Sequence, residues 1–517
     1  MPTALAPEGP STVAFENLVR DIPRSGKTTA AVLRFPWRTV VALTVLAAVL
    51  RVVGLNAGLW IDEIYSLLDS FRPPLGTVLT EYPGDTQHPL YSVLANISHG
   101  VFGESAWSIR LPSVLFGVAS IPLLYALGAR VAGAREGLLA SALLALSYHH
   151  VWFSQNARGY TMLAFWAILS TYLLYRGLEE GGRRRFVWYG VVIGLGVFTH
   201  LTMIFLVAAQ AIVALYWTLR PSSAEEGGRT TDALLGLAIG VATGAALYAP
   251  IFLQVVDFFL NKPSQLEGIS TPTWALAEAL RVLRVGLGAW VGLLGAGLLF
   301  GSGMLSYARR DRLALALFLL PGVVTLVGAL LARGTMYPRF YFFMIGFVFL
   351  IVIRGAFVLG RLVISWVGGS RVEERALSAG TVLSLAMILV SAVSLRANYA
   401  APKQDFAAAA DFVEAEAGPS DVIVTVGVTS LPYERYYGRS YTEASDFASL
   451  EEIRRGGQKV WVLYTFERYI EASDMALAVS LRSACETVRV FPGTVGGGSI
   501  TVCSFGAAGS YGEGGEV

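Results

Sequence analysis

Long apolar segments recur along the whole of this 517-residue chain, and they exclude most folds that a soluble protein can adopt. A helix needs roughly 20 apolar residues to cross the hydrocarbon core of a bilayer. Charged residues make up only 15% of the chain, against about 25% in soluble domains, and the mean hydropathy is +0.57. We therefore expect a polytopic α-helical membrane protein with about eleven transmembrane helices. The candidate segments are Thr39–Asn56, Leu111–Val131, Gly137–Trp152, Tyr160–Tyr175, Val187–Thr199, Leu201–Leu219, Ala233–Val256, Val285–Tyr307, Leu313–Ala332, Phe340–Leu359 and Leu377–Leu395.

The distribution of arginines between the loops predicts the orientation, because cytoplasmic loops are enriched in Arg and Lys. The first long loop, Gly58–Ile109, carries only Arg72, whereas alternate later loops are basic. We expect a multi-pass protein of the plasma or inner membrane, with a cytoplasmic N-terminus and with the first loop and the C-terminus outside. The basic loops contain Arg130, Arg135, Arg176, Arg183, Arg184, Arg185, Arg220, Arg229, Arg309, Arg310, Arg312, Arg361, Arg371 and Arg375.

Changes in composition divide the chain into four expected parts. Residues 1–36 are polar and lack the early apolar core of a signal peptide, so we expect a disordered cytoplasmic tail. Residues 37–398 form the expected transmembrane domain, with a long functional loop at 58–110. Residues 399–506 predict a small extracytoplasmic α/β domain, and 507–517 predict a second disordered tail.

The expected C-terminal domain alternates helix-like and strand-like segments. “KQDFAAAADFVEAEAGPSD” predicts an amphipathic helix that stops at Gly418 and Pro419, and “SLEEIRRGG” and “MALAVSLRSAC” predict two more. “VIVTVGV”, “KVWVLYTF”, “ETVRVF” and “SITVCSF” are typical of strands. Cys485 and Cys503 flank the last hairpin, where a disulfide and two buried free thiols are both possible. “SLPYERYYGRSY” suits sugar or protein contacts, although a folded core with surface aromatics is the plainer interpretation.

Two adjacent carboxylates, Asp62 and Glu63, follow the first apolar segment in “GLWIDEIYSLLDS”. One interpretation is helix capping and solvation at the end of a span. The other is general base catalysis, for which the partly apolar setting beside Trp60 is suitable. Because adjacent helical residues point about 100° apart, the two acids cannot address one atom equally. We therefore assign Asp62 as the base and Glu63 as the neighbour that orients it or tunes its charge.

Further segments resemble, in order, those of one enzyme family. “HPLYSVLANISHGVFGESAWSIRLPSVLFGVASIPLLYALGARVAG” is similar to its His-Pro-Pro-Leu, Phe-Gly and Arg-Leu-Pro pattern, and “SYHHVWFSQNARGYTMLAF” to its Ser-Gln-x-x-Arg-x-Tyr segment. “YPRFYFFMIGFVFLIVIRG” resembles its late Arg-Tyr span, and “KQDFAAAADFVEAEAGPSDVIV” the opening of its outer domain. Together with the acidic pair, these segments resemble the GT-C glycosyltransferases of the protein O-mannosyltransferase and aminoarabinose transferase type, from Trp60 to about Tyr437. The chain departs from the pattern at Leu90, where a second proline is usual, and at Tyr65, where some members carry Arg.

The resemblance implies the GT-C fold and a reaction on the outer face, in which a polyprenyl-phosphate sugar is the donor. The acceptor is a hydroxyl of a protein, a glycan or a lipid. One carboxylate base suffices for a direct, inverting displacement, because the phosphate leaving group needs no acid. That phosphate instead needs cations and hydrogen-bond donors. By resemblance Asp62 is the base, and the residues that bind the donor phosphate or substrate are His88, Arg158, Arg339, Tyr160 and Asp85, which would orient His88.

Each of these residues also has a plainer interpretation. His88 is then an interfacial loop histidine next to a turn, and Tyr160 an aromatic anchor. Arg158 and Arg339 would extend to phospholipid headgroups, which is an ordinary role for arginines at the ends of spans.

The main alternative functions are a secondary transporter or lipid flippase, and a non-catalytic scaffold whose outer domain binds a partner. The first class predicts mid-span charges and inverted repeats, which the sequence lacks. Neither a basic nucleic-acid-binding domain nor a Walker-type nucleotide motif is present in the sequence. A divalent metal is possible and its ligands are unknown, since the spacing of His149, His150 and His200 matches no compact zinc site.

Overall fold

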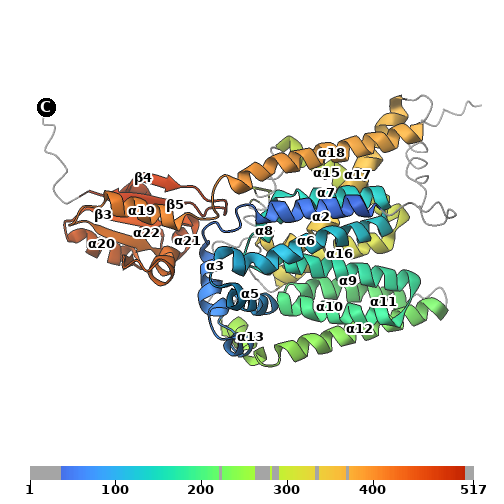
Figure 1. Cartoon of the computed structure of the whole chain (residues 1–517), viewed down its shortest axis with the longest axis horizontal. Helices are drawn as coiled ribbons and strands as arrows, with labels where there is room; N and C mark the ends of the chain where they lie inside the picture. The colour runs from blue at the N-terminus through green and yellow to red at the C-terminus, as the bar shows by residue number, and fades with distance from the viewer. Residues whose placement is uncertain are drawn as a thin grey trace, which may run out of the picture.

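The computed structural model describes residues 36–506, with gaps at 85, 220–223, 262–276, 278–279, 282–289, 332–336 and 368–371. A bundle of long helices and a smaller unit with a β-sheet make up the described chain (Figure 1). Helix α18 (Val372–Tyr399) runs along the bundle and leads into the smaller unit. The predicted tails at 1–36 and 507–517 lie outside the described residues, apart from Pro36.

The helices of the bundle pack around an apolar core formed by residues from most of them. By length and composition, five described helical stretches can cross a membrane: Ala106–Val131, Gly228–Tyr248, Arg312–Leu331, Pro338–Trp366 and Val372–Tyr399. Each of the eleven predicted segments overlaps at least one helix, and the number of spans stays a prediction. Besides α18, the long helices and their short continuations are α2 (Trp37–Val52), α6 (Ala106–Val131), α7 (Ala134–Ala145), α8 (Tyr148–Ser154), α9 (Tyr160–Glu180), α10 (Arg183–Thr199), α11 (Met203–Leu219), α12 (Ala224–Tyr248), α13 (Phe252–Asn261), α15 (Trp290–Arg310), α16 (Arg312–Leu331) and α17 (Ile345–Val367).

Two of the predicted spans are not continuous helices. The segment Gly137–Trp152 divides at Ser147, whose side-chain oxygen accepts a hydrogen bond from the backbone N–H of His150 at 3.4 Å and caps α8. The 12 residues of α7 reach only about 18 Å at 1.5 Å per residue, well short of a bilayer. The segment Ala233–Val256 divides in a similar way between α12 and α13. The break between α12 and α13 lies near the first long loop, because Tyr82 packs against the cluster that contains Tyr248 and Ile251.

The first long loop is itself folded into short helices. It contains α3 (Ile61–Ser66), the π-helical turn η1 (Leu67–Phe71), α4 (Leu75–Thr80) and α5 (Pro89–Phe102). Figure 1 shows α3, α5 and α13 at the end of the bundle that faces the sheet-containing unit. Pro89 occupies the first turn of α5, where a missing N–H removes no helical hydrogen bond, so the chain can enter this helix directly from His88.

The C-terminal unit is built on a mixed five-stranded sheet with the order β2-β1-β3-β5-β4. Strand β1 pairs in parallel with β2 and β3, whereas β5 pairs antiparallel with β3 and β4. All five residues of β3 are buried, which agrees with its apolar sequence “VWVLY”. The elements are α19 (Phe406–Glu416), β1 (Val422–Val426), η4 (Pro432–Tyr436), β2 (Thr442–Ala444), α20 (Phe447–Arg455), β3 (Val460–Tyr464), α21 (Glu467–Ser473), α22 (Met475–Ser483), β4 (Glu486–Phe491) and β5 (Ile500–Phe505).

A disulfide joins Cys485 to Cys503, with 5.6 Å between the two Cα atoms. Of the two alternatives that the sequence leaves open, the structure therefore has the bonded pair. The bond connects the residue before β4 to the middle of β5 and closes the last hairpin.

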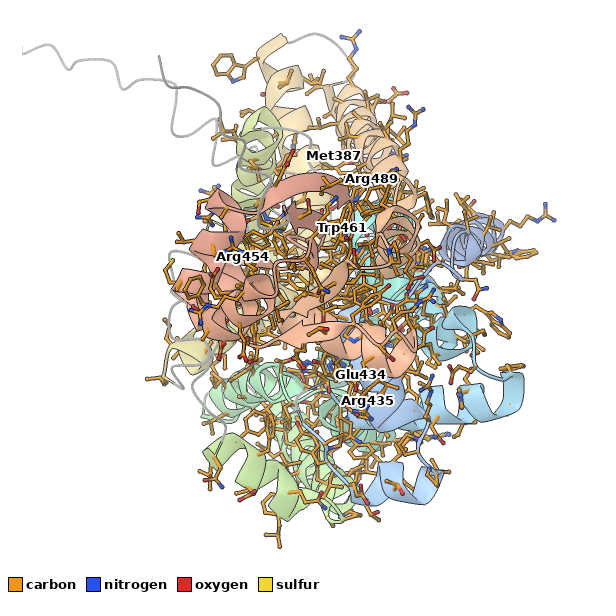
Figure 2. The ribbon with its side chains drawn as sticks, turned by 90° about the vertical axis from the view of Figure 1, so that its left-hand side faces the viewer. Met387, Glu434, Arg435, Arg454, Trp461 and Arg489 are labelled. Atoms are coloured by element: carbon orange, nitrogen blue, oxygen red, sulfur yellow. A yellow bond between two sulfur atoms is a disulfide. The ribbon has the colours of Figure 1, made fainter. Side chains whose placement is uncertain are left out.

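The tyrosine-rich segment around η4 belongs to the core of the unit and to its contact with the bundle. Tyr433 is fully buried, and its hydroxyl donates a hydrogen bond to the backbone oxygen of Phe406 at 3.2 Å. Figure 2 looks at the molecule from the side of the C-terminal unit and shows Glu434 and Arg435 of η4 over the first loop, where η4 contacts α3. The plainer interpretation of this segment, a folded core with aromatics, agrees with these contacts.

Candidate active site

Asp62 and Arg339 form an ion pair at the end of the bundle. Asp62 is the second residue of α3, and Arg339 is the second residue of the 3-10 helix η2 (Pro338–Met344). The distance from Asp62 Oδ2 to Arg339 Nη1 is 3.2 Å, although 277 residues separate the two in sequence. Their side chains are 20% and 32% exposed, so a substrate can reach both. The guanidinium also lies 4.5 Å from the ring centroid of Tyr337, a cation–π contact that limits its movement.

Glu63 has a different environment from its neighbour. It is fully buried, and its carboxylate pairs with both Nε and Nη2 of Arg110, at 2.7 and 2.5 Å. Burial alone would raise the pKa of Glu63, but the charge and hydrogen bonds of Arg110, with the backbone N–H of Ala157, make the net direction downward. Glu63 therefore fixes the start of α3 to α6 and to the segment before α9. Arg110 also donates hydrogen bonds to the backbone oxygens of Leu55, Ala57 and Gly58.

His88 is buried beside α9 with one ring nitrogen engaged. Its Nδ1 accepts a hydrogen bond from the backbone N–H of Gly159 at 2.7 Å. Burial, together with the charges of Arg158 and Arg339, holds the pKa of His88 well below its usual value, so the ring is neutral and carries its proton on Nε2. This Nε2 is buried and has no hydrogen-bond partner among the described residues. His88 thus presents one unsatisfied donor.

Arg158 lies between α8 and α9 and is anchored to the first loop. One nitrogen, Nη1, donates to Ser66 Oγ at 3.1 Å and to the backbone oxygen of Thr86 at 2.5 Å. Ser66 Oγ in turn donates to the backbone oxygen of Asp62 at 2.8 Å. The side chain is buried, and its Nε has no partner among the described residues. A short chain of contacts therefore links Arg158 to the residue proposed as the base.

Aromatic rings surround His88 on the side of α9 and α10. Tyr160 is buried and its ring meets that of His88 edge-on at 5.2 Å, while His200 approaches His88 at 4.5 Å. Burial and the charges of Arg158 and Arg339 lower the pKa of His200 to about 3. Nδ1 of His200 accepts a hydrogen bond from the backbone N–H of Thr202 at 3.2 Å. The two neutral imidazoles therefore add no positive charge to the site.

One predicted site residue cannot be placed, and one of the three histidines considered as metal ligands lies elsewhere. Asp85 lies outside the described residues. His150 is buried against Arg51 of α2, with 2.6 Å between His150 Nδ1 and Arg51 Nη2. Within the described ranges, no three His, Cys, Asp or Glu side chains are arranged as metal ligands would be.

Sequence reasoning missed four residues that the structure places around the site. Arg110 was recognised only as part of an Arg-Leu-Pro pattern, and Asn156 accepts a hydrogen bond from Trp60 Nε1 at 3.0 Å. Lys403 and Gln404, at the start of the C-terminal unit, contact the segments that carry Arg158 and Asp62. In the sequence they appear only as a polar pair in “PKQDF”. Two residues are too few to show a periodic pattern that would indicate a contact.

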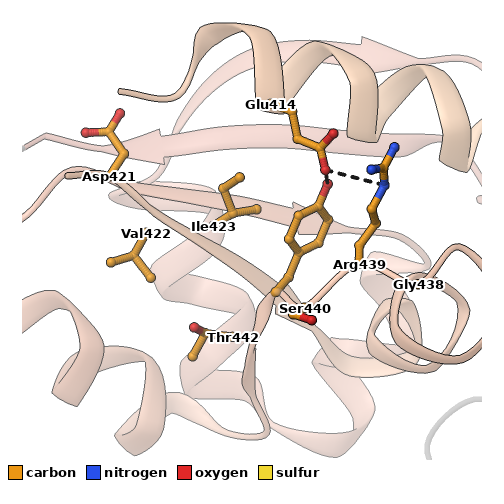
Figure 3. A pocket seen from close by; sticks show the side chains of 9 residues that line it. Glu414, Asp421, Val422, Ile423, Gly438, Arg439, Ser440 and Thr442 are labelled. Atoms are coloured by element: carbon orange, nitrogen blue, oxygen red, sulfur yellow. Dashed lines mark hydrogen bonds and ion pairs between the residues drawn. The ribbon is translucent and has the colours of Figure 1, made fainter. Parts of the chain in front are cut away.

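The C-terminal unit has a separate groove of about 520 Å³ (Figure 3). Glu414, Arg439 and Tyr441 lie on its wall, and Tyr441 donates a hydrogen bond to Glu414 Oε1 at 2.6 Å. Arg439 Nε lies 3.4 Å from the same oxygen. None of the predicted site residues lines this groove, so we assign it no part in the chemistry.

Comparisons with known proteins show what the chain is similar to. Residues 86–242, which carry His88, Arg158 and Tyr160, match the family described as dolichyl-phosphate-mannose-protein mannosyltransferase. YkcB of Bacillus subtilis (strain 168), whose name proposes a mannosyltransferase, is 27% identical over 122 residues. That match covers 23% of this chain and 17% of YkcB, so the chain spans only a small part of this relative's length.

The whole fold is similar to that of a solved bacterial enzyme, ArnT from Cupriavidus metallidurans. In its apo state the TM-score is 0.52 at 13% sequence identity, and the match covers 91% of this chain and 98% of ArnT. The structure of ArnT bound to undecaprenyl phosphate gives a TM-score of 0.51 at 14% identity with the same coverage. At such identities the likeness is one of fold.

Proposed function

We propose that the chain is a glycosyltransferase of the GT-C superfamily, which moves a sugar from a polyprenyl-phosphate donor to an acceptor hydroxyl; the family match, the relative and the similar fold support this proposal. Asp62 is the general base and the displacement inverts the anomeric carbon. The acceptor belongs to a protein, a glycan or a lipid, and the sugar is a hexose or a pentose. ArnT, which has a similar fold, binds undecaprenyl phosphate, and this supports a lipid-linked donor for the present chain.

One observation carries the proposal: the fold brings a partly exposed carboxylate next to an arginine from a distant segment, and a second arginine contacts the same short helix. Asp62 pairs with Arg339 and is linked through Ser66 to Arg158. A base needs access to the acceptor hydroxyl, and the departing phosphate needs positive charge at the same place. The cluster supplies both within one region of the first loop.

The transfer step needs only these groups. The acceptor oxygen attacks the anomeric carbon as Asp62 takes its proton, and the bond between that carbon and the phosphate oxygen breaks. The electron pair of the broken bond stays on the phosphate, which leaves as polyprenyl phosphate. Oδ1 of Asp62, to which no described residue donates a hydrogen bond, is the oxygen available to receive the proton.

Arg158 and His88 would hold the leaving phosphate. Each has a buried nitrogen that finds no partner among the described residues, Nε of Arg158 and Nε2 of His88. Such unsatisfied donors are unfavourable unless a ligand accepts their hydrogen bonds, and phosphate oxygens are strong acceptors. The neutral histidine would act as a donor, and the charge would come from the arginines.

We place the site on the outer face of the plasma or inner membrane, because the first loop is poor in Arg and Lys. A cysteine introduced at exposed Glu81 tests this face. A membrane-impermeant maleimide should label Glu81→Cys in intact cells. Labelling that requires permeabilised cells would overturn the assignment.

The central experiment compares Asp62→Asn with wild type in liposomes. Purified protein is incubated with a panel of radiolabelled polyprenyl-phosphate hexoses and pentoses, and the released polyprenyl phosphate is measured. We expect wild type to turn over at least one donor and Asp62→Asn to lose about 10²- to 10⁴-fold in rate, the usual contribution of a general base. The control is Asp69→Asn, which makes the same change in the same loop without touching the cluster.

The same experiment separates the alternatives. A scaffold or a flippase would release no polyprenyl phosphate from any donor in the panel. A wild-type rate in Asp62→Asn would show that another group is the base. Either result contradicts the proposal.

A further inference from the structure

Two consecutive residues at the start of the C-terminal unit contact the segments that carry the site. The side-chain oxygen of Gln404 accepts a hydrogen bond from the backbone N–H of Ile61 at 2.9 Å. Ile61 is the first residue of α3 and immediately precedes Asp62. The first N–H groups of a helix have no partner within the helix, so Gln404 supplies one from outside. Only 1% of Gln404 is exposed, which protects this bond from competition by water.

Lys403 contacts the other half of the site. Its Nζ donates a hydrogen bond to the backbone oxygen of Gln155 at 2.5 Å, three residues before Arg158. The ammonium also lies 5.3 Å from the ring centroid of Trp152 in α8. This segment has little regular structure between α8 and α9, so its position depends on such side-chain contacts.

The C-terminal unit holds both residues rigidly. Gln404 Nε2 donates to Thr465 Oγ1 at 3.2 Å, just after β3. The backbone oxygen of Lys403 accepts from the N–H of Val495, at 3.2 Å, in the connection between β4 and β5. In the same connection, Thr494 Oγ1 accepts a hydrogen bond from Trp152 Nε1 at 3.0 Å. Hydrogen bonds therefore connect the sheet and its last hairpin to the segment that leads to Arg158.

We propose that Lys403 and Gln404 are positioning residues through which the C-terminal unit sets the geometry of the transfer site. Gln404 fixes the first turn of α3 and hence Asp62, and Lys403 fixes the backbone that leads to Arg158. The base and the phosphate-binding arginine are then held at their mutual distance by a part of the chain that lies outside the bundle. The catalytic part of this inference rests on the proposed function, but the positioning part does not.

The charges that face Lys403 make its role testable by pH. Among the described residues, Arg110 of α6 and Glu63 of α3 are the groups whose charges shift the pKa of Lys403. Burial and the charge of Arg110, partly offset by Glu63, lower the pKa of Lys403 to about 7. A lysine whose pKa is lowered by its surroundings is held there more favourably when it is neutral, so the placement of Lys403 beside Gln155 weakens as the pH falls below about 7.

The experiment uses full-length protein in liposomes and two readouts. Hydrogen–deuterium exchange measures the mobility of the segments at 59–64 and 155–159, and turnover is measured with the donor that wild type uses. We expect Gln404→Met to speed exchange at 59–64, and Lys403→Met to speed exchange at 155–159. Each should lower kcat about tenfold, which corresponds to loss of about 1.4 kcal/mol and hence of one hydrogen bond, with little change in KM for the donor. Gln404→Glu keeps the accepting oxygen and should restore kcat.

The chain offers matched controls for both substitutions. Gln254→Met removes an equivalent bond to the backbone N–H of Tyr82, farther along the same loop, and should leave kcat unchanged. Lys459→Met removes a lysine that lies 4.0 Å from the ring centroid of Trp461 within the C-terminal unit. For Lys403→Met, the deficit relative to wild type should be smaller at about pH 6 than at about pH 8, because protonation of Lys403 disfavours its buried position. Neither control should show that dependence.

The outcomes distinguish this inference from the proposed function. Unchanged exchange and unchanged kcat in Lys403→Met and Gln404→Met would overturn the positioning role. Faster exchange in both variants, in a protein that turns over no donor, would support positioning and contradict the proposed function. A loss of kcat that Gln404→Glu fails to restore, or that the controls share, would also overturn the inference.

Discussion

The buried pair of Glu63 and Arg110 gives the sharpest quantitative prediction. The substitution Glu63→Gln keeps the shape of the side chain but replaces one carboxylate oxygen with an NH₂ donor. In the wild type one oxygen accepts from Arg110 Nε and the backbone N–H of Ala157, and the other from Arg110 Nη2 and the backbone N–H of Trp60. Whichever way the glutamine amide turns, two buried donors lose their acceptor and face another donor.

The magnitude follows from burial. Leaving two buried donors unsatisfied costs about 2–6 kcal/mol, and removing one partner of a buried ion pair costs about 3–5 kcal/mol. We therefore expect Glu63→Gln to lower the free energy of unfolding by about 3–5 kcal/mol. Arg110→Met should be similarly destabilising alone, but the double variant should lose less than the sum, because neither charge is then left unpaired.

An exposed pair in the same loop is the matched control. Arg72 donates to both carboxylate oxygens of Glu104, at 2.8 and 2.7 Å, but the two side chains are 36% and 39% exposed. Glu104→Gln should cost about 1 kcal/mol or less. Unfolding by SDS in mixed micelles, followed by tryptophan fluorescence, gives all four free energies. If Glu63→Gln and Glu104→Gln differ by less than about 1 kcal/mol, the structural role assigned to Glu63 is wrong.

Three further predictions concern other parts of the molecule. A Cβ at Gly159 would lie 2.8 Å from His88 Nδ1, so Gly159→Ala should displace the imidazole and slow donor turnover by about 5- to 150-fold, the equivalent of about 1–3 kcal/mol. Gly100→Ala, where no heavy atom lies within 4 Å, should retain the wild-type rate. Opening the disulfide by Cys485→Ser should lower the free energy of unfolding by about 3 kcal/mol, since the bond closes a loop with a sequence separation of 18. Because the folded pKa of His200 is about 3, the unfolded chain alone binds its proton between that value and the ordinary value of 6.5, so stability should fall as the pH falls through this range. At about pH 5 His200→Gln should be more stable than wild type by about 2 kcal/mol, with no difference at about pH 8, as measured by unfolding at the two pH values.

The long helices and most of the sheet were predictable from sequence, because hydrophobic periodicity over many residues leaves few alternatives. The strands at Val460–Tyr464 and Ile500–Phe505 and the helix at Phe406–Glu416 lie within segments that the pattern predicted. The three-residue strand Thr442–Ala444 was missed, since so short a stretch carries no measurable alternation. The break at Ser147 was missed for a different reason. Within an apolar segment, the sequence does not distinguish a serine that caps a new helix from a serine inside a continuous helix.

The site was predictable only as far as local motifs allow. Asp62 and Arg339 were both singled out, but nothing in the sequence indicated that they would pair across 277 residues. Lys403 and Gln404 carried no signal beyond being a polar pair, because a contact between two folded units depends on their relative placement. That placement follows from the packing of α18 and the sheet. Short sequence segments do not predict such packing.

The adjacent acids Asp62 and Glu63 have two different physical roles, although they belong to one motif. On a helix, consecutive side chains diverge by about 100°, so at the edge of a bundle one of them faces the interior and the other faces the surface. The interior position removes a carboxylate from water, which is tolerable only with a complete set of partners, and Glu63 has them in Arg110 and Ala157. A carboxylate satisfied in this way has no oxygen left to accept a proton from a substrate. The surface position leaves Asp62 with a single ion pair and a side chain that is 20% exposed, which is the condition that a general base requires. The buried acid thus fixes the helix, and the fixed helix presents Asp62, the carboxylate that we propose as the base.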